Sequence, residues 1–139
     1  MKLEYIKSAI TVGILLIIFD YIWLKYIFIK PWKNMVTKIQ ISPFDTRIKY
    51  AVPVYLLIVL AIIVYVLPKI NNKSIFKDSL VYGGLLGLII YGVFDFTNMI
   101  FFEKYLLNLA LIDMMWGTFL FTIVTYFTKK FLINSKYII

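Results

Sequence analysis

Residues 79–102 form an apolar run long enough to cross a lipid bilayer, which takes about 20 such residues in a helix. Two polar residues, Asp95 and Asn98, interrupt this run. A polar side chain in hydrocarbon needs a partner, so we expect this helix to turn one face toward other protein segments. Residues three or four apart share that face, and they are Gly84, Gly87, Tyr91, Asp95 and Asn98. The run therefore predicts a membrane-spanning helix inside a bundle.

Three further apolar segments complete the predicted fold, and 63% of all residues are hydrophobic, which is typical of an integral membrane protein. We expect spans over residues 8–29, 50–67, 79–102 and 106–127, with Pro31 and Pro68 ending the first two. The second span carries no charge, and its surface is nearly uniform Val, Ile and Leu, so we expect it to face mostly lipid. The fold class is an all-α membrane protein, a four-helix transmembrane bundle in which residues 1–139 form one domain.

The polar segment 30–49 separates the first two spans. Four of its apolar residues repeat at helical spacing, and they are Trp32, Met35, Val36 and Ile39. This pattern predicts either a short interfacial helix that lies on the membrane surface or an ordinary connector with a helical turn.

The basic residues flank the spans and give the chain a formal net charge of +8. We therefore expect the lipid bilayer, and anionic lipid headgroups in particular, to be partners, and nucleic acid not to be one. Four spans put both termini on one side. The first seven residues, loop 69–78 and the tail with Lys129, Lys130 and Lys136 carry eight lysines, against six Lys or Arg in the other loops. The difference favours cytoplasmic termini.

Three aspartates lie within the spans, where an ionisable group is costly. With a rise of about 1.5 Å per residue, Asp95 and Asp113 reach similar depths, and Asp20 lies between the midplane and the same side. We expect the carboxyl groups to meet in a polar intramembrane cluster with indole, phenol and amide donors. The expected members are Asp20, Trp23, Tyr91, Asp95, Asn98, Asp113 and Trp116.

Two of the aspartates stand in matching contexts, Asp20-x-x-Trp23 and Asp113-x-x-Trp116, on helices that run in opposite directions. An inverted repeat leaves such an echo, and chance is the simpler explanation for four residues. Small residues mark close helix packing, and the expected packing positions are Gly83, Gly84, Gly87, Gly92 and Gly117. We expect the motif Gly83-x-x-x-Gly87 to pack within the bundle rather than against a second copy.

Three motifs together carry a resemblance to a known family. They are Asp20-x-x-Trp23-Leu24, Gly87-Leu88-x-x-Tyr91-Gly92-x-x-Asp95-x-Thr97-Asn98, and Asp113-x-x-Trp116-Gly117-Thr118. The chain resembles a family of small, mainly bacterial, predicted membrane proteins catalogued as a domain of unknown function. The resemblance covers nearly the whole chain and implies four membrane helices, without implying an activity. The sequence departs from the family before the last span, where Glu103-Lys104-Tyr105 replaces a Trp-Pro.

The chain contains no histidine and no cysteine, which removes the commonest general base and all thiol chemistry. The favoured reading is a non-enzymatic membrane component that scaffolds, or binds protein partners or lipid, with the aspartates as structural links and with no cofactor or metal. A protein partner or a homo-oligomer fits this reading. One alternative is a small proton- or cation-coupled carrier that uses the aspartates, and another is a membrane component of a large DNA virus particle. A carboxylate–magnesium enzyme is the least favoured, because the sequence lacks further polar residues to hold a substrate.

Overall fold

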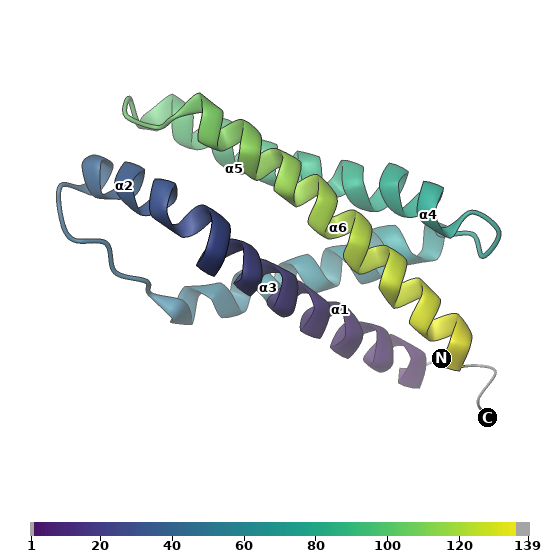
Figure 1. Ribbon diagram of the computed structural model, residues 1–139. Helices are drawn as coiled ribbons and strands as arrows, with labels where there is room; N and C mark the ends of the chain where they lie inside the picture. The colour runs from purple at the N-terminus through teal and green to yellow at the C-terminus, as the bar shows by residue number, and fades with distance from the viewer. Residues whose placement is uncertain (1, 136–139) are drawn as a thin grey trace.

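The computed structural model describes residues 2–135, and every regular element in that range is helical (Figure 1). Lys136 of the basic tail lies outside these residues. Within residues 2–135, four helical passes are long and apolar enough to cross a membrane, and they are Leu3–Gln40, Ile48–Lys69, Ile75–Phe101 and Leu107–Ile133. The predicted all-α, four-helix membrane bundle is confirmed.

The first pass is one continuous helix that consists of α1 (Lys2–Trp23), the π-helical turn η1 (Leu24–Phe28) and α2 (Ile29–Gln40). The prediction that Pro31 ends this helix is wrong. A proline ring collides with the carbonyl group four residues earlier, here that of Ile27. That carbonyl lies inside η1, a wider turn than that of an α-helix, so the helix continues past Pro31.

The second pass is built from several short helical elements. It begins with η2 (Ile48–Tyr50), continues through α3 (Ala51–Ala61) and the π-helical turn η3 (Ile62–Val66), and ends with η4 (Leu67–Lys69). Pro68 lies in the last turn, and the pass ends one residue later, close to where the sequence predicted. Large apolar side chains are exposed along most of α3, as expected for a lipid-facing helix; they are Val52, Val54, Leu56, Leu57 and Leu60.

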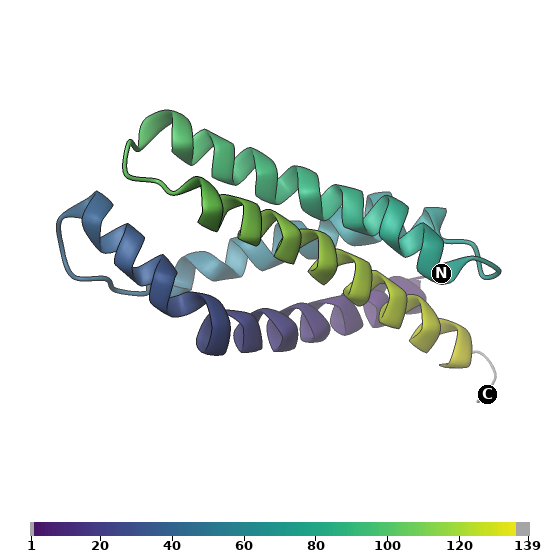
Figure 2. The ribbon, with the colours of Figure 1, turned by 45° about the horizontal axis from the view of Figure 1, so that its top comes forward.

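The last two passes form the centre of the bundle. The third runs through α4 (Ile75–Asp78), the π-helical turn η5 (Ser79–Gly84) and α5 (Leu85–Phe101), and a short connection leads to α6 (Leu107–Ser135). Within its most apolar window, 44% of α6 is buried, against 22–28% for the other three passes. Figures 1 and 2 show that α1 begins and α6 ends at the same end of the bundle.

The third pass and α6 pack closely because glycines line their contact. A Cβ atom at Gly87 would overlap the backbone carbonyl of Gly117, and one at Gly117 would overlap the ring of Tyr91. The other three packing positions also face α6, where their nearest side chains are Thr125 for Gly83, Thr122 for Gly84 and Met114 for Gly92. The absence of side chains at these positions lets the two backbones touch.

Two apolar clusters fill the bundle at its two ends. The larger joins α1, the second pass and α6 around Val12, Ile62 and Phe121. The smaller joins the end of the first pass to the start of α6 around Phe28, Met35, Tyr105, Leu109 and Ala110. Residues 32–39 are helical, but they form part of α2 and continue the first pass, so they are neither a separate short helix nor a connector. This segment packs on the second cluster through the buried Met35.

Candidate functional site

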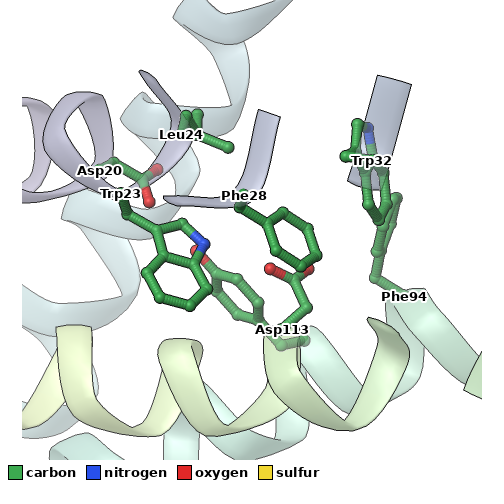
Figure 3. A pocket seen from close by; sticks show the side chains of 8 residues that line it. Asp20, Trp23, Leu24, Phe28, Trp32, Phe94 and Asp113 are labelled. Atoms are coloured by element: carbon green, nitrogen blue, oxygen red, sulfur yellow. The ribbon is translucent and has the colours of Figure 1, made fainter. Parts of the chain in front are cut away.

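A pocket of about 210 Å³ lies between the first pass, α5 and α6, beside the smaller apolar cluster, to which Phe28 belongs. Figure 3 shows Trp23 and Phe28 on one side and Asp113 on the other, projecting toward one another across the pocket. The lining is aromatic and acidic, and it consists of Asp20, Trp23, Leu24, Phe28, Trp32, Tyr91, Phe94 and Asp113.

Asp20 ties three passes together. Its side chain is 9% exposed, and each of its two carboxyl oxygens accepts one hydrogen bond from another pass. The Tyr55 hydroxyl of α3 donates to Oδ2 at 2.7 Å, and the Trp116 indole Nε1–H of α6 donates to Oδ1 at 2.8 Å. Asp20 therefore acts as a structural link, because both of its oxygens already have protein partners.

The two tryptophans of the matching motifs stack on each other. The rings of Trp23 and Trp116 lie 4.5 Å apart between centroids and are parallel to within 2°. Their N–H groups differ, however, because Trp116 donates to Asp20 whereas Nε1 of Trp23 is buried without a hydrogen-bond partner among residues 2–135. The two matching motifs thus contribute a stacked pair of tryptophans, in which only the N–H of Trp116 has a hydrogen-bond partner among the described residues.

Asp95 is fully buried on α5 and is only half satisfied. The hydroxyl of Tyr105, in the connection between α5 and α6, donates to Oδ1 at 2.6 Å. The second oxygen, Oδ2, is buried and has no partner in the described part of the chain. Tyr105 also contacts Trp32 of α2 edge-on, with 5.9 Å between ring centroids, so Asp95 lies beside the aromatic end of the pocket.

Asp113 differs from the other two aspartates because no described side chain donates a hydrogen bond to it. It is only 8% exposed, and it lines the pocket together with Asp20. It lies close enough to Asp95 and to Asp20 to interact with both electrostatically. The three intramembrane aspartates are therefore neighbours in space. Among residues 2–135, they do not form a group close enough to hold a metal ion.

The π-helical turn η1 shapes one wall of the pocket. At about 100° per residue, twelve residues of regular α-helix would leave Trp32 roughly 120° around the helix from Asp20. A π-helical turn takes about one residue more, which removes most of that difference. Trp32 consequently lines the same pocket as Asp20, Leu24 and Phe28.

Two members of the expected cluster make contacts that differ from those expected. Asn98 donates its amide Nδ2–H to the backbone carbonyl of Phe94, within its own helix, at 2.9 Å. Tyr91 lines the pocket, and its ring lies between Gly117 and Phe121.

Sequence reasoning did not include six residues of the site, namely Leu24, Phe28, Trp32, Tyr55, Phe94 and Tyr105. Tyr55 and Tyr105 had a recognisable signal, because buried carboxyl groups need donors and a chain without histidine has few to offer. The three aromatic residues resemble ordinary core or interface residues and gave no such signal.

A separate set of buried hydroxyl groups lies nearer the end of the bundle that holds the start of α1. Ser79 of η5 and Thr125 and Thr128 of α6 are fully buried, and their hydroxyl oxygens have no partner among the described residues. Gly83 packs directly on Thr125, so the contact between η5 and α6 is tight at this level.

The fold and the buried carboxyl groups define a class, namely multi-pass integral membrane proteins with ionisable groups inside the bundle. Within that class the chain belongs to the family described as predicted membrane protein (DUF2177), whose model matches residues 5–129. The resemblance carried by the three motifs is thereby confirmed at the level of the family. No curated protein and no solved structure matches the chain.

Proposed function

We propose that this membrane protein binds a cation inside its helix bundle, with Asp113 as the main binding group. The observation that carries the proposal is the buried carboxyl group of Asp113, which lines a pocket and receives no hydrogen bond from the described residues. A buried carboxylate needs a proton, a counter-charge or several donors. A bound cation would supply the counter-charge that no described side chain provides to Asp113.

The charges around the pocket support this proposal. No described lysine or arginine pairs with any of the three aspartates. Lys25 follows Asp20 by little more than one turn, yet it is exposed and donates to the hydroxyl of Tyr21 on the outer surface at 2.8 Å. The pocket is therefore acidic without an internal counter-charge, which is the environment that attracts a cation.

Structural linkage is the rival explanation, and it accounts for the aspartates unequally. It explains Asp20, which uses both oxygens to join three passes, and it explains one of the two oxygens of Asp95, which accepts from Tyr105. It gives no account of Asp113, whose removal would break no hydrogen bond among the described residues. Scaffolding, the binding of a protein partner and contact of the basic loops with anionic headgroups are compatible with cation binding.

The test uses tryptophan fluorescence, because Trp23 and Trp32 line the pocket and Trp116, the third tryptophan of the chain, stacks on Trp23. Protein in phosphatidylcholine nanodiscs is titrated with sodium, potassium or methylammonium chloride at constant total salt. We expect a saturable change with at least one of these ions. Asp113→Asn should abolish that change without lowering the stability of the fold.

Asp45→Asn is the matched control, since it makes the same chemical change on an exposed loop residue. It should titrate like the wild type. A folded wild-type protein that shows no saturable change with any of the three ions would contradict the proposed function. So would an Asp113→Asn variant that binds as well as the wild type.

A further inference from the structure

We infer that the pocket takes a small organic ammonium ion that also carries a hydrogen-bond acceptor, held between Asp113 and the indole N–H of Trp23. This inference rests on the proposed function and specifies its ligand. A protonated amino alcohol has the required chemistry. The same groups occur in a free amine and in an ethanolamine lipid headgroup.

The first argument comes from the two matching motifs. The structure contains one hydrogen bond between them, from Nε1 of Trp116 to Asp20. The reciprocal bond, from Nε1 of Trp23 to Asp113, is absent, although both side chains line the same pocket. In one half of the stacked arrangement, the donor of Trp116 and the acceptor of Asp20 satisfy each other. The other half contains a buried, unused donor on Trp23 and an unused acceptor on Asp113, and both residues line the pocket (Figure 3).

The second argument comes from the size and lining of the pocket. Since a water molecule occupies about 30 Å³ in the liquid, a pocket of about 210 Å³ has room for a molecule of several non-hydrogen atoms. Most of its wall consists of aromatic rings, and the oxygens of Asp20 already have protein partners. Calcium and magnesium ions need about six oxygen ligands or more, which these side chains do not supply.

The third argument assigns the two ends of the ligand. The carboxyl group of Asp113 only accepts when it is ionised, so the group beside it must donate and carry positive charge. The indole of Trp23 only donates, so the group beside it must accept. An ammonium group near a hydroxyl oxygen satisfies both at once, and its short alkyl chain contacts the rings of Phe28 and Trp32.

The test compares four probes by tryptophan fluorescence of the full-length protein in phosphatidylcholine nanodiscs. They are ethanolammonium, ethylammonium, which lacks the hydroxyl, tetramethylammonium, which lacks the N–H donors, and potassium. One hydrogen bond contributes about 0.5–1.5 kcal/mol, so we expect ethanolammonium to bind roughly two- to tenfold more tightly than ethylammonium. Tetramethylammonium and potassium should bind more weakly than either.

A substitution at Trp23 tests whether the hydroxyl group of the ligand accepts a hydrogen bond from this residue. Trp23→Phe keeps an aromatic ring in the stack but removes the N–H, so it should lower the affinity for ethanolammonium to that for ethylammonium and leave the latter unchanged. Trp116 and Trp32 remain as reporters. Asp113→Asn should abolish binding of both amines, and Asp45→Asn should change neither. The comparison of the four probes in the wild type keeps the inference testable if a variant does not fold.

The outcomes separate this inference from the proposed function. Saturable binding of sodium or potassium in preference to the amines would overturn the inference and leave cation binding intact, whereas no binding of any cation would overturn both. Equal affinities for the two amines would show that water satisfies Trp23, which also overturns the inference. If it holds, adding phosphatidylethanolamine to the nanodiscs tells the sources apart. If phosphatidylethanolamine lowers the apparent affinity for free ethanolammonium, the ligand is a lipid headgroup. If the affinity does not change, the ligand is a free amine.

Discussion

The link from Tyr55 to Asp20 makes a measurable prediction about stability, because Tyr55→Phe removes one hydroxyl and leaves the ring in place. The bond is 2.7 Å long and joins two different passes. Hydrogen bonds between membrane helices average about 0.6 kcal/mol and reach about 1.7 kcal/mol. With a carboxyl acceptor at short distance, we expect Tyr55→Phe to lower the free energy of unfolding by about 1 kcal/mol, which is roughly a fivefold change in the unfolding equilibrium.

The assay is reversible unfolding in detergent micelles with increasing dodecyl sulfate, followed by circular dichroism. The substitution is made in the wild type and in an Asp20→Leu background, where the acceptor is gone, and there it should cost almost nothing. Tyr65→Phe is the matched control in the same pass, because Tyr65 is 65% exposed. Equal losses from Tyr55→Phe in both backgrounds would refute the assignment of Asp20 as a link between passes.

Two further predictions concern the packing and the second buried carboxyl group. Gly87→Ala should destabilise the bundle by about 1–3 kcal/mol, because the added methyl group would overlap the carbonyl of Gly117. The control Gly13→Ala meets only ordinary contacts and should cost nothing. Equal effects of the two substitutions in the same unfolding assay would contradict the close α5–α6 contact. Tyr105→Phe should cost about 1–3 kcal/mol, because it leaves Asp95 without any described donor. A loss no larger than that of the exposed tyrosine control would argue against this contact.

The sequence was sufficient for the number of passes, and it allowed the three aspartates to meet without requiring it. Both follow from simple quantities, because apolar length determines whether a helix can span, and the rise per residue determines depth. Asp20, Asp95 and Asp113 lie near one another because their helices place them at one level. The depth argument needed no knowledge of side-chain contacts.

The local backbone geometry could not be predicted from the sequence. Pro31 is a reliable signal for the end of a helix only if the preceding turn is regular, and the π-helical turn η1 removes that condition. The same turn brings Trp32 into the pocket, so a residue expected in a surface helix or a connector is part of the site. Helical periodicity assumes a constant turn and therefore fails wherever a π-helical turn intervenes.

The hydrogen-bond partner of Asp95 could not be predicted from the sequence either. Asn98 shares a helix face with Asp95, yet its amide bonds to its own backbone, while Tyr105 from the following connection supplies the donor. Spacing along one helix shows which residues share a face. It does not show which donor from another segment arrives within 3 Å, because that depends on how the passes are rotated about their axes.

The central claim is that Asp113 faces a pocket rather than packed protein, and reactivity of a single thiol tests it most directly. The chain has no cysteine, so Asp113→Cys introduces the only one, and Thr125→Cys provides a fully buried comparison on the same helix. We predict that 2-aminoethyl methanethiosulfonate, a small cationic reagent, labels Asp113→Cys in nanodiscs much faster than Thr125→Cys. Labelling of Asp113→Cys that is no faster than that of Thr125→Cys would contradict the claim.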